Sequence, residues 1–160
     1  QLVKAKAYSE NWDAFRRDGI GLLLFGNVGT GKSYAAGCIA NALLEQMVSV
    51  LFVGLSDVVN RMQGKFGADR DAYMKMLMRP ELLILDDLGT EFPTSFSSST
   101  IYNMINSRLM TSKPTIISTN LTMRELEKQY SQRLVSRIMG NHVRLEFLGS
   151  DVRQKKRLIR

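Results

Sequence analysis

The segment at 26–33 reads GNVGTGKS and has the residue types that bind phosphate. It matches the pattern G-x-x-x-x-G-K-[ST], and it lies between an apolar segment, LLLF, and a helix-compatible one. Glycines in such a loop let successive backbone N–H groups point at phosphate oxygens, and the following helix directs its positive dipole end at them. The sequence therefore predicts a phosphate-binding loop (P-loop) for a nucleoside triphosphate.

Two side chains of this loop have distinct expected roles. Lys32 is expected to neutralise the β and γ phosphates, and the hydroxyl of Ser33 to bind Mg²⁺. A glycine-rich turn that only joins a strand to a helix is the structural alternative, which the complete pattern disfavours. ATP and Mg²⁺ are the expected cofactors. The expected nucleotide-binding residues are Gly26, Asn27, Val28, Gly29, Thr30, Gly31, Lys32, Ser33 and Tyr34.

A second apolar segment, ELLILDDLG at 81–89, ends in two adjacent carboxylates. Asp86 is expected to hold Mg²⁺ through water, and Asp87 to polarise the attacking water. Glu91 is a further carboxylate nearby that could share the base role, and it ranks second. An acidic pair after a strand also occurs as a helix cap or turn former. The P-loop upstream favours the catalytic interpretation.

A polar residue, Asn120, follows the apolar segment TIIST. Its amide could orient the hydrolytic water or contact the γ phosphate, although Asn-Leu-Thr is also an ordinary start for a helix near Met123. The order of P-loop, acidic strand end and polar strand end resembles the AAA+ ATPases, where the third feature is called sensor 1. The resemblance gives Asn120 a role in hydrolysis.

Two arginines, Arg133 and Arg137, lie four residues apart on an expected helix and so share one face. In AAA+ proteins an arginine at such a position acts as a finger on the neighbouring subunit's nucleotide, and the resemblance assigns this role to Arg137, with Arg133 as the alternative. A solvated basic face is an equally good interpretation of both. The resemblance also makes Arg153 the sensor 2 residue that reads the γ phosphate, with Arg157 as substitute.

The elements that must position these residues follow from the hydrophobic pattern. Apolar runs without polar alternation suit strands buried on both faces, and their alternation with helices predicts an α/β fold with a parallel sheet. Strands are expected at 21–25, 50–53, 82–85, 115–119 and 143–148. Helices are expected at 32–47, 97–110, 122–129, 131–139 and 151–159, with two more at 56–79 that are broken around Gly64 and Gly67.

Three other residues are expected to be structural. Cys38 lies among small and apolar residues of the helix at 32–47 and is expected to be a buried thiol. Met47 is expected on the buried side of the same helix. His142 has no ligand-type residue near it in sequence, so it is no candidate for a metal site.

Composition limits the function classes. The 160 residues, 44% of them hydrophobic, suffice for one well-packed domain, and a single domain over 1–160 is expected. Five cations and one carboxylate in the last ten residues carry +4 of the net charge of +7, so the rest is not basic enough for a nucleic-acid surface throughout. No apolar run approaches the roughly 20 residues of a membrane helix. With only one cysteine, the composition favours the cytoplasm.

The motifs together resemble one branch of the AAA+ ATPases. GLLLFGNVGTGKSYAAGCIANAL, LLILDDLGTE, TIISTNL and RLVSRI are similar to the bacterial helicase-loader family of the DnaC and DnaI type, and to the related transposition helper ATPase IstB. The similarity extends from about Tyr8 to Arg157. Asp87 stands where most AAA+ members carry glutamate. Ser33 replaces the more usual threonine and preserves its hydroxyl.

The resemblance implies a three-layer P-loop NTPase fold of the AAA+ type, with a five-stranded parallel sheet flanked by helices and no separate lid domain. It implies slow, oligomer-dependent ATP hydrolysis, single-stranded DNA binding, self-association into an oligomer or filament, and help in loading a hexameric replicative helicase. The chain begins with Gln1 rather than Met. It is therefore expected to be the carboxy-terminal part of a longer protein whose amino-terminal helicase-binding domain is absent.

Three alternatives stay open at this point. A transposition or phage-encoded helper ATPase would share the same core. A P-loop small-molecule kinase would need an arginine-rich acceptor lid, whereas the methionine-rich segment 56–79 has only Arg61, Arg70 and Arg79. A binding module that does not hydrolyse ATP would use it only as a structural ligand. The candidate DNA contacts are the basic carboxy-terminal helix and the polar residues of 56–79.

Overall fold

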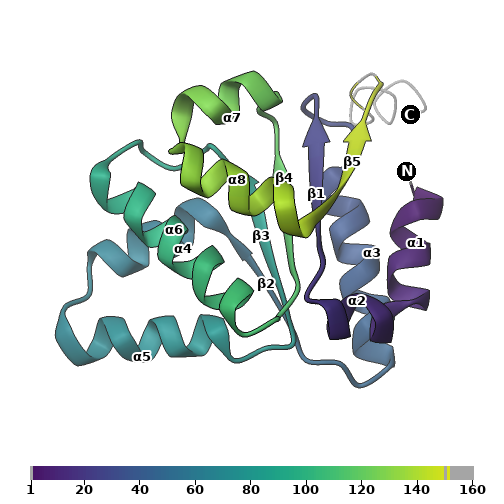
Figure 1. Ribbon diagram of the computed structural model, residues 1–160, viewed down its shortest axis with the longest axis horizontal. Helices are drawn as coiled ribbons and strands as arrows, with labels where there is room; N and C mark the ends of the chain where they lie inside the picture. Colours follow the sequence, from purple (N-terminus) through teal and green to yellow (C-terminus); the bar gives the residue numbers. More distant parts are fainter. Residues whose placement is uncertain (1, 150, 152–160) are drawn as a thin grey trace, which may run out of the picture.

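The computed structural model describes residues 2–149 and 151, and it shows a parallel sheet between two layers of helices (Figure 1). The five strands are β1 (Gly21–Gly26), β2 (Val50–Gly54), β3 (Leu82–Leu88), β4 (Thr115–Thr119) and β5 (His142–Phe147). Their order across the sheet is β2-β3-β4-β1-β5, and every neighbouring pair is parallel. The carboxyl ends of all five strands therefore lie at one edge of the sheet, called here the carboxyl edge.

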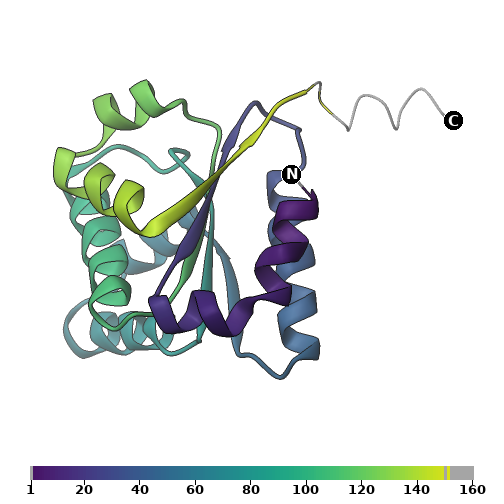
Figure 2. The same cartoon turned by 45° about the vertical axis from the view of Figure 1, so that its right-hand side comes forward.

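The helices divide between the two faces of the sheet, as Figure 2 shows. One layer contains α1 (Leu2–Glu10), α2 (Trp12–Asp18) and α3 (Lys32–Glu45). The other contains α4 (Leu55–Gln63), α5 (Gly67–Met78), α6 (Ser95–Met110), α7 (Met123–Gln129) and α8 (Gln132–Asn141). Successive strand residues face opposite layers, so Leu22 and Leu24 join the core on the α3 side and Leu23 joins the other core. The predicted three-layer α/β fold is confirmed.

The expected elements agree well with the structure. Each predicted strand is present, and the largest difference is that β3 continues beyond Leu85 to Leu88. The break predicted within 56–79 lies between the end of α4 at Gln63 and the start of α5 at Gly67. The helix expected at 151–159 falls outside the described residues except for Asp151. None of the described helices has the length and apolar character that crossing a membrane requires.

Two expectations for α3 are wrong. Met47 is 91% exposed and adopts φ 63°, because the helix already ends at Glu45. Its end is closed by bonds from the Val48 N–H to the Leu43 carbonyl (3.0 Å) and from the Met47 N–H to the Leu44 carbonyl (2.9 Å), a Schellman arrangement. Cys38 is also exposed. The inward face of α3 is filled by Ala35, Ala36, Ile39, Ala40 and Leu43.

The sequence patterns predict no helix before β1, yet α1 and α2 occupy this segment. Both helices are short, so their stability depends on packing rather than on propensity. Tyr8 and Trp12 are buried against α3 and the sheet, and the Tyr8 hydroxyl donates to the Ile20 carbonyl at 2.8 Å. Two aromatic anchors thus substitute for the periodicity that a longer amphipathic helix would display.

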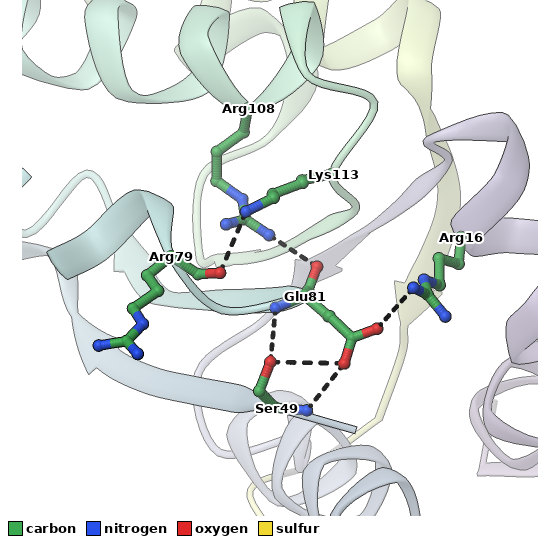
Figure 3. A network of polar contacts seen from close by, with 6 residues as sticks. All are labelled: Arg16, Ser49, Arg79, Glu81, Arg108 and Lys113. Carbon is green, nitrogen blue, oxygen red and sulfur yellow. Dashed lines mark hydrogen bonds and ion pairs between the residues drawn. The ribbon is translucent and has the colours of Figure 1, made fainter. Parts of the chain in front are cut away.

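A polar network ties the amino ends of β2, β3 and β4 together, at the edge opposite the carboxyl edge (Figure 3). Arg108 is 1% exposed, and its guanidinium donates to the carbonyls of Pro80 (3.0 Å), Glu81 (2.9 Å) and Pro114 (2.7 Å). The Glu81 carboxylate accepts from the Ser49 N–H (3.2 Å) and pairs with Arg16 at 3.0 Å. This network stabilises the sheet at the edge that lies opposite the carboxyl edge and its loops.

Candidate nucleotide-binding site

The loop between β1 and α3 lies at the carboxyl edge, and two of its glycines adopt conformations that other residues rarely adopt. Gly26 has φ 131°, and a Cβ there would lie 2.2 Å from the Phe147 carbonyl oxygen. Gly29 has φ 75°, and a Cβ there would lie 2.1 Å from the carboxyl group of Asp151. Both positive φ values favour glycine, and at Gly26 the Phe147 backbone also leaves no space for a side chain.

Lys32 closes the loop from within. It is 5% exposed, and its Nζ donates to the carbonyls of Gly26 (2.8 Å) and Asn27 (2.6 Å). The Thr30 hydroxyl donates to the same Asn27 carbonyl at 2.8 Å. The ammonium is thereby held against the loop, next to the amino terminus of α3, where a phosphate would be attracted by both. Tyr34, in the first turn of α3, is 69% exposed.

Two of the predicted metal-binding residues meet directly. The Ser33 hydroxyl donates to Oδ1 of Asp86 at 3.0 Å, although the two residues are 53 positions apart. A hydroxyl and a carboxylate oxygen at this separation are hard oxygen donors of the kind that Mg²⁺ prefers, with phosphate and water completing its shell. These two residues fit the magnesium ion that the P-loop implies.

Ser118 in β4 holds the acidic strand end in place. Its hydroxyl donates to Oδ1 of Asp86 at 2.5 Å and accepts from the Asp87 N–H at 2.9 Å. Ser118 lies within β4 and is fully buried. It is not among the site residues predicted from the sequence. The available signal was a hydroxyl within the otherwise apolar core of TIIST, two residues before Asn120.

Asp87 has an unusual backbone for a residue that is not glycine, because its φ is 60°. The left-handed region costs such a residue about 1 kcal/mol, so the surrounding bonds must hold it. The Thr90 hydroxyl and N–H both donate to the Asp87 carbonyl, at 2.8 and 3.2 Å. The ladder between β3 and β4 shifts register here, between Leu85 and Leu88. This irregularity turns Asp87 away from the regular strand alternation.

Glu91 is not free to share the base role that the sequence left open for it. It is 5% exposed, its Oε2 accepts from the Gly89 N–H at 2.9 Å, and its Oε1 accepts from the Tyr130 hydroxyl. Both carboxylate oxygens are therefore engaged within the fold. Burial first, and the bond to Glu91 second, raise the pKa of Tyr130 above its ordinary value. Tyr130 thus remains a neutral donor to Glu91.

Asn120 follows β4, which lies between β3 and β1 in the sheet. Its position is therefore between the acidic strand end on one side and the P-loop on the other. It is half-buried. The topology brings the P-loop, Asp86, Asp87 and Asn120 to one edge, as the order of motifs led us to expect.

The arginines of α8 lie apart from this group. Arg137 places its guanidinium 5.5 Å from the ring centre of Tyr102, and both residues border a hollow between α6 and α8 with a volume of about 600 Å³. Arg133 also lines the hollow, and the described P-loop residues do not. Arg133 and Arg137 thus belong to the layer that contains α4 to α8, called here the outer layer. Arg153 and Arg157 lie outside the described residues.

Comparisons with known proteins agree with this geometry. A family model described as IstB-like ATP binding protein matches residues 12–157. The replicative helicase loader DnaC of Escherichia coli (strain K12) is 30% identical over 145 residues, or 88% of this chain and 58% of that protein. The chain therefore spans less than two thirds of the length of this relative.

Two solved structures share the fold. The crystal structure of the DnaC helicase loader superposes with a TM-score of 0.81 and 23% identity, over 91% of this chain and 87% of that one. The crystal structure of DnaI gives a TM-score of 0.76 and 27% identity, over 93% and 82%. These neighbours place the sheet and its helices in the AAA+ class of P-loop folds. Because the family model covers most of the sequence, the chain belongs to the family of IstB-like ATP-binding proteins.

Proposed function

We propose that this chain is an ATP-hydrolysing AAA+ domain that works in a replicative helicase loader. The observation that carries the proposal is the direct bond between Ser33 of the P-loop and Asp86 at the end of β3. It joins the two halves that a magnesium nucleotide site needs, and Asp87 follows at once.

In this proposal each residue has one task. Lys32 and the loop amides bind the β and γ phosphates, while Ser33 and Asp86 hold the metal ion in position. When bound, Mg²⁺ neutralises charge on the phosphate oxygens. Asp87 accepts a proton from the attacking water, and the Asn120 amide orients that water. Water attacks the γ phosphorus, the bond to the β-γ bridging oxygen breaks, and ADP and phosphate leave.

The site is completed by a second copy of the chain. Arg137 lies on the outer layer beside α6, where a neighbouring subunit's nucleotide could reach it. An arginine supplied in this way stabilises the charge of the transition state and commonly speeds hydrolysis by a factor of about 10³ or more. An isolated subunit should therefore bind ATP well and hydrolyse it slowly.

The loader role rests on the relatives rather than on the site. The 30% identity to the loader DnaC supports it, as does the shared fold. Single-stranded DNA and a hexameric replicative helicase are the proposed partners. The chain spans 58% of the DnaC relative, so we place helicase binding in a part of the protein outside this sequence and treat 1–160 as one AAA+ domain.

Nucleotide binding tests the proposal first. The affinity for ATP with Mg²⁺ should be measured by calorimetry for the natural sequence, for Lys32→Ala and for Lys6→Ala, an exposed lysine of α1. Lys32→Ala should lose about a hundredfold in affinity, because a charge-assisted bond to phosphate disappears. Lys6→Ala should bind normally. Equal affinity in all three proteins would contradict the assignment of the P-loop.

A transposition helper ATPase remains the second candidate, because the matching family model is described by IstB. The two candidates differ in their protein partner. Co-purification of the full-length protein with a hexameric replicative helicase supports the loader. Retention by a transposase, with no helicase bound, supports the helper.

A further inference from the structure

Glu91 is a buried carboxylate that forms no ion pair with the residues that the structure describes. Two hydrogen bonds stabilise it instead. Oε2 accepts from the Gly89 N–H and Oε1 from the Tyr130 hydroxyl, in a place where Glu91 is 5% exposed and Tyr130 is 6% exposed. Burying a carboxylate costs several kcal/mol unless donors of this kind compensate. The burial of Glu91 therefore has a structural or functional reason.

The reason lies in the segment between β3 and α6. Asp87 and Gly89 have φ values of 60° and 103°, so the chain turns twice within three residues. The Thr119 hydroxyl donates to the Leu88 carbonyl at 2.7 Å, which fixes the residue between the two turns. Glu91 fixes the second turn through the Gly89 N–H. The Asp87 carboxylate can keep one position only if these turns do.

Tyr130 connects this segment to the arginines of α8. It follows α7 directly and precedes Ser131, whose hydroxyl caps α8 by accepting from the Leu134 N–H at 3.3 Å. Its own N–H donates to the Leu126 carbonyl at 3.0 Å. A single side chain therefore joins the Asp87 segment to the first turn of the helix that bears Arg133 and Arg137.

We propose that Glu91 and Tyr130 are a positioning pair that holds Asp87 in place to accept a proton from the attacking water and that couples Asp87 mechanically to α8. The inference rests on the proposed hydrolysis at Asp87. Glu91 itself contacts neither nucleotide nor water in this scheme. When the neighbouring nucleotide engages Arg137 and shifts α8, the pair transmits that shift to the Asp87 of its own subunit.

Substitutions of Glu91 separate positioning from base catalysis. Glu91→Gln keeps an oxygen for the Gly89 N–H and an amide that can donate to the Tyr130 oxygen, but it cannot accept a proton from water. It should hydrolyse ATP within about threefold of the natural sequence, whereas Glu91→Ala should lose about a hundredfold in kcat with unchanged ATP affinity. If Gln were as inactive as Ala, Glu91 would be the base and the positioning pair would be wrong.

Tyr130→Phe and Tyr8→Phe form a matched comparison of buried tyrosines. Tyr130→Phe loses the bond to Glu91 and a longer one (3.4 Å) that the hydroxyl accepts from the Gln129 amide, and Tyr8→Phe loses one bond. Tyr8 bonds the Ile20 carbonyl in the opposite layer, so Tyr8→Phe reports only on stability. Tyr130→Phe should lower kcat about tenfold and leave ATP affinity unchanged, which Tyr8→Phe should not do. Equal kcat for the two variants, in protein that remains folded, would overturn the pair.

Amide hydrogen exchange makes the inference independent of turnover. Glu91→Ala should increase exchange both in 87–91 and in 131–134 at the start of α8, and Tyr8→Phe in neither. Faster exchange confined to 87–91 would overturn the coupling to α8. Lack of ATP hydrolysis by the natural protein under every condition would instead contradict the proposed function. The exchange result would still decide whether the pair couples the two segments.

Discussion

At the scale of single residues, the proposed hydrolysis depends on Asp87. Its neighbours fix its backbone, while Lys32, Ser33 and Asp86 account for nucleotide and metal. Asp87→Asn should therefore leave ATP affinity unchanged and lower kcat roughly a hundredfold or more, because the amide cannot accept the proton. Single-turnover hydrolysis beside equilibrium binding would measure both. Loss of affinity without loss of kcat would assign Asp87 to binding instead.

Ser118 offers a second test at the same scale. Ser118→Ala removes the donor to Asp86 and the acceptor for the Asp87 N–H, so the metal ligand loses its orientation. Residues that orient a metal ligand are commonly worth a factor of about ten to a hundred in metal affinity or activity. The concentration of Mg²⁺ that half-saturates ATP hydrolysis should rise about tenfold. Ser99→Ala, on the exposed face of α6, is the control and should match the natural protein.

At the scale of elements, substitution of Arg108 tests how much the polar network contributes to the stability of the sheet. Burial lowers the pKa of Arg108 to about 10, so it stays charged at neutral pH and its bonds to three strand-end carbonyls remain. Arg108→Met leaves those carbonyls unpaired and should lower the free energy of unfolding by about 3 kcal/mol. Arg16→Ala removes only a half-exposed partner of Glu81 and should cost less than about 1 kcal/mol. Urea denaturation compares the two, and equal losses would contradict the network's role.

His142, at the junction between α8 and β5, should make the stability of the protein depend on pH. Its Nδ1–H donates to the Ile138 carbonyl at 2.9 Å, while burial lowers the pKa of His142 from 6.5 to about 4. Between these values the unfolded chain binds the extra proton, so stability is complete above pH 6.5 and falls as the pH drops towards 4. Between pH 7.5 and 5.5 the loss should be about 1 kcal/mol.

The chain has a single histidine, which makes the control simple. His142→Asn should be less stable at pH 7.5 but should show almost no change in the free energy of unfolding between pH 7.5 and 5.5. A flat profile for the natural sequence in that window would show that the half-buried His142 does not control the stability.

The sequence predicts the helices and strands that have a periodic hydrophobic pattern. It does not predict the features that depend on contacts between residues distant in sequence. The strand at 82–85 could be predicted because its residues, LLIL, are apolar on both faces. The short helices α1 and α2 could not, since Tyr8 and Trp12 stabilise them through the opposite side of the core. The same reason explains Ser118, whose partner Asp86 is 32 residues away in sequence and adjacent only across the sheet.

At the scale of the whole molecule, neighbouring subunits share each site in the proposed mechanism. Arg137 faces the hollow beside α6, and the P-loop and Asp87 occupy the carboxyl edge. Such head-to-tail contacts generate rings or filaments rather than closed two-fold dimers. Arg137→Ala alone should therefore bind ATP normally and lose the hydrolysis that depends on assembly, which can be measured with and without single-stranded DNA.

Mixing two inactive variants tests the shared site most directly. Asp87→Asn keeps the arginine and Arg137→Ala keeps the carboxylate, so an assembly of both contains interfaces with one intact member from each. At equal amounts, about a quarter of the interfaces should be complete, and ATP hydrolysis should recover to about a quarter of the natural rate. A mixture of Asp87→Asn with the double variant should stay inactive. No recovery in the first mixture, under conditions where the natural protein assembles and hydrolyses ATP, would contradict the account.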